Sequence, residues 1–561
     1  MYTDATAATA PGTTASTSGG PTRRPRRLRR LIPVVAVMAG GVLLAGCTAV
    51  QSGLAQAASG TSTGTGTSQT STTTAVASAT LDELVSTNED GTVVREDEWS
   101  QDDAIDVTLS GSGATAASGV TSADGVVTVT EAGVYRLSGS LDGRVVVAAP
   151  EDALVVLILD GATIDSAAGP AIEVQTADDV AIHLAEGSDS AITDTTGYAE
   201  DADANAAIFS EQDLTLSGAG TLTVDAAGDG ITSEDDLAII GGTIAVTAAD
   251  EALRGKDSIQ VEAGTLALDA GGDALQSDND EEEGRGWIRI EGGTIDATAG
   301  DDGFNALTDI LIGGGTVSVE ATGDGLHADV ALAVAAGAVT VEGSDEGLES
   351  ALVQLDGGTI DITASDDAIN GSAGSSTTDA SAGPGAMGGM GGMADSGELV
   401  SITGGEVTLR AGGDGLDSNG SIEISGGTVT VWGPTSDGNG ALDANGGLTV
   451  SGGTLLAVGS SGMAESPEAG SSQAWLQAAA SGQAGSSVEI LDADGTVLAS
   501  YTAERAFSDV VFSSSGLTGE TATVTVDGAA TEVALGTATA GGQGGGGQGG
   551  GMGGGMGPGR P

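Results

Sequence analysis

Basic residues, aromatic residues and cysteine are all scarce in this chain. Its 16 Lys and Arg residues stand against 80 Asp and Glu residues, and the formal net charge of −64 argues against direct binding to nucleic acid or to an anionic membrane surface. Aromatic residues make up only 2% of the sequence, so the fold does not depend on a large aromatic core. The single cysteine and two histidines leave oxygen atoms as the plentiful metal ligands.

Glycine, alanine, threonine, valine and aspartate are abundant instead. The 561 residues include 96 glycines, and this composition indicates short strands joined by tight turns. Neither an H-E-x-x-H zinc motif nor a phosphate-binding loop occurs in the sequence. Because so few bases accompany the carboxylates, we expect a cation to take part in the function.

The N-terminus has the pattern of a secretion signal. Six arginines between residues 23 and 30 precede the apolar run "LIPVVAVMAGGVLLAGC", which is too short for a comfortable membrane span. The closing "LAGC" resembles a bacterial lipobox, which implies that residues 1–46 are removed and that Cys47 is lipidated. A plain signal peptide and an uncleaved anchor are the alternatives, and the export route stays open. We therefore expect a secreted protein that is lipid-anchored to the outer face of the bacterial cell membrane.

Two segments of low complexity flank the rest of the chain. Residues 47–100 are rich in Ser, Thr, Gly and Ala, and we interpret them as a flexible linker. Residues 537–561 are glycine-rich, and their composition predicts disorder.

An internal repeat of about 22 residues dominates the sequence between residues 101 and 460. One apolar residue follows each short acidic stretch, and a "GGT" marker recurs in the same phase. The apolar residues are Ile208, Ile231, Leu253, Leu275, Phe304, Leu326, Leu348, Ile369, Leu416 and Leu442, with spacings of 23, 22, 22, 29, 22, 22, 21, 47 and 26. Polar or Gly/Met-rich insertions at 277–286 and 372–398 account for the two longest spacings.

Short segments with apolar residues at alternate positions, such as "GTIAVTA" and "GTIDITA", fill each repeat. Two or three such strands in 22 residues, with no helical period, predict one rung of a right-handed parallel β-helix. The fold class is therefore all-β. Residues 461–536 lose the period but keep strands, and we interpret them as a small β-rich C-terminal cap over the last rung.

Acidic residues precede the aligned apolar residues and are expected to form a ladder along one edge of the coil. A ladder of carboxylates repels itself unless protons or cations lie between them. Oxygen ligands outside the cell favour calcium, so we predict Ca²⁺ sites here. The alternative is that these are solvated turn residues without an ion. The candidate metal ligands are Asp229, Glu251, Asp273, Asp301, Asp302, Asp324, Asp345, Glu346, Asp366, Asp367 and Asp414.

A second polar column follows one residue after the apolar positions. Its members could contact sugars, although stacked structural hydrogen bonds are the commoner explanation. Two tryptophans, one beside an insertion and one after a strand, are the plausible exposed rings for a polysaccharide, or they are packed instead. The candidate carbohydrate-binding residues are Trp287, Asn305, His327, Asn370, Asp417 and Trp432.

Several segments together resemble a family of bacterial carbohydrate-binding domains with a pectate-lyase-like right-handed β-helix and bound calcium. They are "VTVTEAGVYRLSGSLDGRVVV", "VVLILDGATIDSAAGPAIEV", "GGTIDITASDDAIN", "GGDGLDSNGSIEISGGTVTV" and "LDADGTVLASYTAERAFSDVVFSSSGL". The resemblance covers roughly residues 100 to 535. It implies non-catalytic binding of polysaccharide, either acidic pectic chains or cellulose.

Two other functions remain open on the sequence. A calcium-dependent polysaccharide lyase needs a base beside the ion, and Arg254 and Lys256 are the only candidates on the ladder. A structural or adhesive surface rod needs no soluble ligand. The high negative charge favours a monomer.

Overall fold

The computed structural model describes residues 80–116, 118–194, 198, 202, 204–373 and 395–538. The chain divides into two compact units, Met1–Ser68 and Gln69–Pro561, and every described residue belongs to the second one. Cys47, the predicted signal peptide, the first part of the linker, most of the Gly/Met-rich insertion and the glycine-rich tail lie outside the described residues. Within the described part, no helix is long and apolar enough to cross a membrane.

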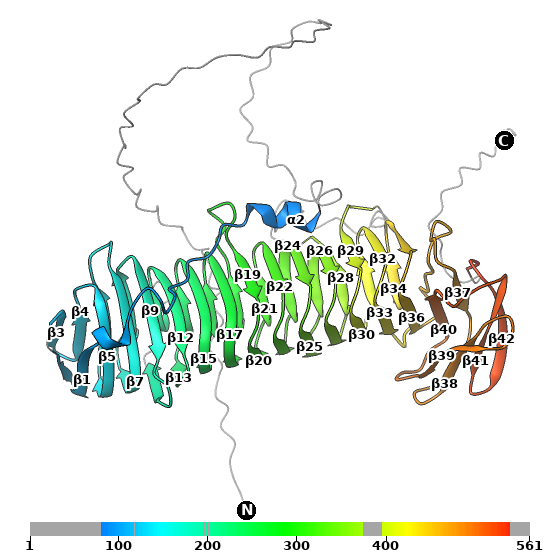
Figure 1. Cartoon of the computed structure of the whole chain (residues 1–561). Coiled ribbons are helices and arrows are strands. Elements are labelled where there is room, and N and C mark those ends of the chain that lie inside the picture. Colours follow the sequence, from blue (N-terminus) through cyan, green and yellow to red (C-terminus); the bar gives the residue numbers. More distant parts are fainter. Residues whose placement is uncertain are drawn as a thin grey trace, which may run out of the picture. The chain divides into compact units, whose positions relative to one another are not determined.

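The second unit is almost entirely β-structure, and 38 of its strands form one continuous sheet (Figure 1). Successive coils of the chain pair in parallel: Thr221 lies opposite Thr243, and Thr243 lies opposite Thr265. Each coil therefore stacks on the coil before it, and three columns of strands run through the stack.

The edge column follows each acidic turn. Its strands are β4 (Val126–Val129), β6 (Arg144–Ala148), β8 (Ile172–Thr176), β11 (Ala206–Ser210), β14 (Asp229–Ser233), β16 (Leu253–Gly255), β18 (Leu275–Ser277), β21 (Phe304–Ala306), β28 (Ile369–Gly371), β31 (Leu416–Ser418) and β34 (Leu442–Ala444). The long strands β24 (Leu326–Val334) and β26 (Leu348–Leu355) begin in the edge column and continue into the middle column.

The middle column comes next along each coil. Its strands are β9 (Asp179–Leu184), β12 (Asp213–Gly218), β19 (Trp287–Ile290), β22 (Asp309–Ile312), β29 (Leu399–Ile402), β32 (Ser421–Ile424) and β35 (Gly447–Val450). Five longer strands span the middle column and the third column: β1 (Ile105–Gly111), β5 (Gly133–Asp142), β7 (Leu154–Ser166), β15 (Asp236–Ala248) and β17 (Ser258–Ala270).

The third, or Thr, column begins with threonine in most coils. It contains β10 (Asp189–Asp194), β13 (Thr221–Ala226), β20 (Thr294–Ala299), β23 (Thr316–Ala321), β25 (Ala338–Gly343), β27 (Thr359–Ala364), β30 (Glu406–Ala411), β33 (Thr428–Trp432) and β36 (Thr454–Gly459). At the first coils, β2 (Gly113–Thr115) and β3 (Val120–Ala123) add antiparallel pairs with β1 and β4.

The predicted alignment of apolar residues is confirmed by the strand register. Ile231 pairs with Leu253, and Leu253 pairs with Leu275, all buried. Across the 29-residue step Leu275 still pairs with Phe304, because the insertion leaves the coil between β18 and β19. Side chains alternate in and out along each strand, as β20 shows with three exposed and three buried positions, so the apolar residues stack inside the coils.

A segment before the first coil, residues 80–104, lies along the middle column, and we call it the strap. It contains helix α2 (Leu81–Leu84) and the short 3₁₀ helices η1 (Val85–Thr87) and η2 (Gln101–Asp103). The Thr80 hydroxyl and the Glu83 side chain form a capping box that starts α2. The sequence interpretation placed residues up to 100 in a flexible linker, whereas the structure orders this last part of it.

The strap contacts many coils in turn. Leu81 and Leu84 pack against a small apolar cluster on β24 and β26, and Asn88 donates to Asp309 of β22 at 2.9 Å. The Thr92 amide then donates to Asp236 of β15 at 2.8 Å, and the Gln101 side chain lies 3.2 Å from His183 of β9. The strap therefore runs back along the stack towards the first coil.

A partly exposed ion pair of the strap is expected to contribute little stability. Arg95 meets Glu262 with both guanidinium Nη atoms at 2.6 Å from the carboxylate oxygens, and 47% of the Arg95 side chain is exposed. Because water and salt screen such a pair, Arg95→Ala should lower the free energy of unfolding by no more than about 1 kcal/mol. Urea unfolding at low and high salt measures this, and a loss above about 2 kcal/mol would contradict it.

The C-terminal segment closes the stack. Strand β40 (Asp509–Ser514) pairs antiparallel with β36 of the last coil and with β37 (Trp475–Ala478). A separate four-stranded antiparallel sheet follows, made of β38 (Ser487–Leu491), β39 (Val497–Thr502), β41 (Thr521–Val526) and β42 (Ala529–Ala534). Phe512 is buried in the apolar cluster that joins this sheet to the last coil. The antiparallel pairing of β40 occupies the edge that a further parallel coil would use.

Candidate functional site

The acidic ladder lies at the turn that leads into the edge column, and its carboxylates bridge neighbouring coils. Asp273 accepts the Asp302 amide at 2.9 Å, and Asp302 accepts the Asp324 amide at 2.7 Å. Asp324 in turn accepts the Glu346 amide at 3.2 Å. Because each coil returns after one repeat, these carboxylates meet the backbone of the next coil, and so do Asp367 and Asp414, which accept the amides of Asp414 and Gly440. The ladder consists of Asp229, Glu251, Asp273, Asp302, Asp324, Glu346, Asp367 and Asp414.

The ladder residues and the acids that precede them differ in exposure. Asp229 and Asp273 are buried, and the other ladder residues are half-buried. The four preceding acids are exposed: Asp250, Asp301, Asp345 and Asp366. Asp345 accepts a hydrogen bond from the Ser365 hydroxyl at 2.8 Å. An ion at the edge could thus use inner carboxylates and their more exposed neighbours together.

Burial raises the pKa of several ladder carboxyls, because the charged form loses water in this position. The pKa reaches about 8 for Glu346 and about 6 for Asp302, with the charges of neighbouring acids adding to the effect of burial. Burial likewise raises the pKa of Asp367 to about 6. The raised pKa values mean that the charged forms of these carboxyls are unfavourable in the folded protein. A cation bound between the carboxylates would stabilise the charged forms.

The polar column supplies hydrogen bonds to the ladder. The Asn305 side-chain amide donates to Asp273 at 3.0 Å and to Asp302 at 3.2 Å, and Asn370 donates to Glu346 at 2.7 Å. These two predicted sugar-binding residues are therefore engaged with carboxylates of the same edge. Their amide groups stabilise the charged form of the ladder, as stacked hydrogen bonds between coils would.

His327 is surrounded by acids. Its Nδ1 lies 2.9 Å from Glu349 and 3.3 Å from Asp324, and its Nε2 lies 3.3 Å from Asp329. Burial alone would lower the pKa of His327, but the hydrogen bonds to Asp324, Asp329 and Glu349 outweigh it and raise the pKa to about 12. This part of the ladder thus carries its own cation, the imidazolium.

The end of the ladder has a different composition, and we call it the terminal carboxylate group: Asp414, Asp417, Asp443 and Glu465. Oxygens of the three aspartates lie within 4.8 Å of one another. Glu465 accepts the Ala444 amide at 3.2 Å. Among the described residues, none of the four carboxylates forms an ion pair with Lys, Arg or His.

The pKa values in the terminal carboxylate group are all raised. Burial, together with the charges of Asp367, Asp443 and Asp414, raises the pKa of Asp417 to about 8. Burial also raises the pKa of Asp414 and of Glu465 to about 7. Clustered carboxylates that have no basic partner among the described residues offer the oxygen ligands that a hard cation prefers.

A second group without histidine lies near the start of the ladder. Oxygens of Asp229, Asp250 and Glu251 come within 4.8 Å of one another. Asp229 is fully buried, and its Oδ1 has no hydrogen-bond partner among the described residues. Burial and the adjacent Asp229 raise the pKa of Glu251 to about 8. A buried oxygen without a partner here fits an ion ligand, and carboxylates alone again favour calcium over softer metals.

The sequence interpretation did not assign Asp443 and Glu465 to the metal site. Asp443 belongs to the polar column, one residue after Leu442, and Glu465 comes after the last aligned repeat. The signal was present, because Glu465 follows Asp443 by 22 residues, the length of one repeat. Asp417 was predicted to bind sugar, and the structure places its carboxylate beside those of Asp414 and Asp443.

The two tryptophans are not exposed, so the expectation of accessible rings is wrong. Trp287 has 0% exposure and Trp432 has 5%. The strap covers Trp287, since a Cβ on Gly91 would come within 3.4 Å of its ring, while Trp432 packs into the cluster between the last coil and the cap. Neither ring can stack on a flat polysaccharide surface.

Arg254 and Lys256 are both held by acids. Arg254 lies 2.9 Å from Glu234 and 2.9 Å from Asp278, and Lys256 lies 3.2 Å from Glu234. Although burial acts in the opposite direction, these acids raise the pKa of Arg254 above its ordinary value. A base that removes a proton must first lose its own, so this environment opposes such a role.

Comparison with known proteins gives a match over part of the chain. Residues 123–378 match the model of a family described as "Carbohydrate-binding domain-containing protein". This match covers edge-column coils that include the ladder from Asp229 to Asp367.

One relative is a carbohydrate-binding domain-containing protein of Acetivibrio thermocellus, which is 37% identical to this chain over 121 residues. The matched part is 20% of this chain and 42% of the relative, so the chain spans less than half of that protein's length. A solved structure, the polysaccharide lyase-like protein from C. thermocellum in a gadolinium derivative, is 26% identical. It covers 46% of this chain and 95% of its own, with a TM-score of 0.34.

Proposed function

We propose that this protein binds acidic polysaccharide, of the pectic type, through calcium ions held on the ladder of a right-handed parallel β-helix, without catalysis. The proposal places it at the bacterial surface as a monomeric lipoprotein attached through Cys47. The carbohydrate-binding family match supports a polysaccharide as partner. The remaining parts depend on the chemistry of the ladder.

One observation carries the calcium part of the proposal. The terminal carboxylate group brings four acids together without a basic partner among the described residues, and their pKa values are raised. Carboxylate oxygens are the preferred ligands of calcium, and a bound ion supplies the positive charge that the group lacks.

The ladder also supports an acidic polysaccharide as the proposed partner. Calcium accepts six to eight oxygen ligands, so an ion held by two or three protein carboxylates keeps positions for uronate oxygens. Repeating carboxylates along the coils provide repeated positions of this kind. Cellulose has no carboxylate, and with Trp287 and Trp432 buried neither tryptophan offers a ring on which it could stack.

The non-catalytic part of the proposal depends on Arg254 and Lys256. Both side chains are committed to ion pairs with Glu234, and Arg254 also binds Asp278. A lyase reaction would need one of them to be released and deprotonated beside the ion. No ultraviolet-absorbing unsaturated product is expected when the protein is incubated with polygalacturonate and calcium.

Retention on an insoluble glycan tests the binding role. The purified protein is expected to remain on polygalacturonate in calcium, to elute with chelator, and to show little retention on cellulose. The variant D417N/D443N should lose at least about tenfold in retention, since it removes two negative ligands. The matched control D269N/D296N changes two exposed aspartates of the Thr column and should behave as the unaltered protein.

Two outcomes would contradict the proposal. Equal retention with calcium and with chelator would exclude ion-mediated binding of the glycan. Equal loss in D417N/D443N and in D269N/D296N would show that general negative charge, and not the terminal carboxylate group, controls retention.

A further inference from the structure

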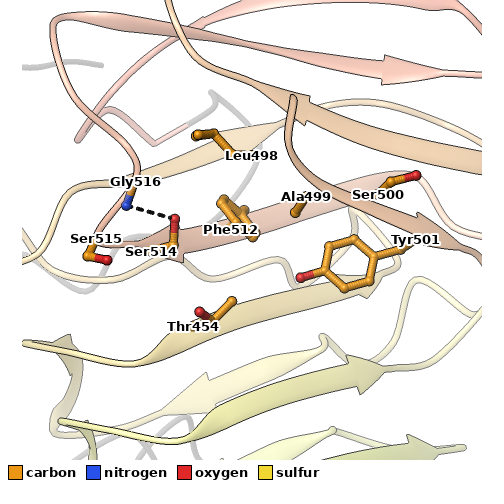
Figure 2. Close-up of a pocket in the computed structure, with 9 residues that line it drawn as sticks. All are labelled: Thr454, Leu498, Ala499, Ser500, Tyr501, Phe512, Ser514, Ser515 and Gly516. Carbon is orange, nitrogen blue, oxygen red and sulfur yellow. Dashed lines mark hydrogen bonds between the residues drawn. The ribbon is translucent and has the colours of Figure 1, made fainter. Parts of the chain in front are cut away.

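A pocket of about 490 Å³ lies between the last coil and the C-terminal sheet, away from the acidic ladder. Figure 2 shows Thr454 of β36, Tyr501 of β39 and Phe512 of β40 at its borders. Leu498 and Ala499 of β39 and a turn at 514–516 complete the lining. A volume of this size accommodates one or a few sugar units.

The pocket combines a small apolar area with free hydroxyl groups. Phe512 is buried beneath the surface, and the half-buried side chains of Leu498 and Tyr501 provide the apolar area. The hydroxyls of Thr454, Ser500 and Tyr501 make no hydrogen bond to another described residue. These groups can donate and accept hydrogen bonds to a ligand without breaking existing ones.

No residue that lines the pocket carries a charge at neutral pH. The lining consists of Thr, Leu, Ala, Ser, Tyr, Phe and Gly only, and burial raises the pKa of Tyr501, which keeps its phenol protonated. An anionic ligand would find no cation here, within a chain of net charge −64. A fully apolar ligand would bury the hydroxyls of Thr454 and Tyr501 without partners.

We propose that this pocket binds a neutral sugar unit, independently of calcium. A pyranose ring has apolar C–H faces and a rim of hydroxyls, and this pair of properties matches a lining that offers the Tyr501 ring and the Leu498 side chain together with free hydroxyls. This inference rests on the proposed carbohydrate-binding function only for the class of ligand, a sugar. The pocket itself lies outside the ladder and outside the residues that match the family model.

Calorimetric titration of the purified protein in chelator tests the pocket. The probes are hexasaccharides of glucose, xylose and mannose, each raised to 10 mM. At least one is expected to bind, and Tyr501→Ala should weaken that binding at least about tenfold, because it removes the ring and its hydroxyl. Tyr501→Phe, which keeps the ring, should weaken it less. Thr502→Ala changes the exposed neighbour on the same strand and should have no effect.

The outcomes separate this site from the ladder. Absence of binding for all three probes would overturn the proposal, as would equal binding by Tyr501→Ala and the unaltered protein. Binding that persists in Tyr501→Ala but is lost in D417N/D443N would place neutral sugars on the ladder and would also overturn it. If Tyr501→Ala does not fold, Tyr501→Phe combined with Ser500→Ala provides the same comparison. Failure of polygalacturonate retention leaves this result unaffected, since chelator is present throughout.

Discussion

In chelator, the protein is expected to unfold at a higher temperature at pH 5 than at pH 8, by at least about 5 °C. The reason is the set of raised carboxyl pKa values on the ladder. Glu251, Glu346 and Asp417 each reach about 8, so the folded protein binds protons that the unfolded chain releases near pH 4. Each unit of pKa difference corresponds to about 1.4 kcal/mol in stability.

The sign follows from the direction of these shifts. A carboxyl with a raised folded pKa contributes stability below its unfolded pKa and loses it as the pH rises towards 8. Glu234 and Glu262 have lowered pKa values, and their stabilising effect is lost only below about pH 4.5. His183, with a pKa that burial lowers, opposes the trend between pH 5 and 6.5, but it is one group against several.

Calcium should weaken this pH dependence. Because the ion binds deprotonated carboxylates, it is expected to raise the unfolding temperature more at pH 8 than at pH 5. Asp417→Asn resembles the protonated residue, so it should raise the unfolding temperature in chelator at pH 8 and reduce the gain from calcium. Scanning calorimetry at both pH values measures these quantities. An unfolding temperature that rises from pH 5 to pH 8 in chelator would refute the argument.

Arg285→Met is expected to destabilise the protein by about 3–5 kcal/mol. The guanidinium lies 3.2 Å from Asp236 and 3.2 Å from Glu89 of the strap, and its Nε lies 3.6 Å from Asp257. Asp236 is 4% exposed and also accepts the Thr92 amide. Removing the arginine leaves a buried carboxylate without its cation, which costs far more than losing a surface pair.

A matched control separates charge from packing. Arg289→Met changes an arginine of β19 that lies over the Trp287 ring at 4.7 Å from its centroid, and it should cost about 1 kcal/mol or less. Asp236→Asn should recover part of the stability lost in Arg285→Met, because it removes the unpaired charge. Equal losses in the two arginine variants, measured by urea unfolding, would show that the Asp236 carboxylate is not the cause.

The edge of the coil was predictable because its residues repeat. Backbone pairing between coils requires equal lengths, and the spacing of 22 residues from Leu253 to Leu275 and from Phe304 to Leu326 gives that length. The same period places Asp302 against Asp324, so the ladder follows from the repeat. A sequence repeat does not indicate which other segments pack against the coils. The sequence around Trp287 therefore did not indicate that the strap, at Gly91, would bury its ring.

The insertion at 277–286 illustrates a further limit. Its polar composition predicts a projecting loop, yet Asn279 is 3% exposed and Arg285 is part of a buried ion network. Polar side chains are buried where partners from distant segments satisfy them, and here Asp236 and Glu89 come from other parts of the chain.

The sequence by itself determined the coil, its period, the apolar stack and the ladder, since strand alternation and an equal rung length leave few other arrangements for these residues. Only the tertiary structure decided which acids lie beside a positively charged side chain. His327 and Arg254 neutralise parts of the edge, while the terminal carboxylate group has no such partner among the described residues. That difference arises because charge compensation depends on distances between side chains from different coils and from the strap, and no local pattern specifies those distances.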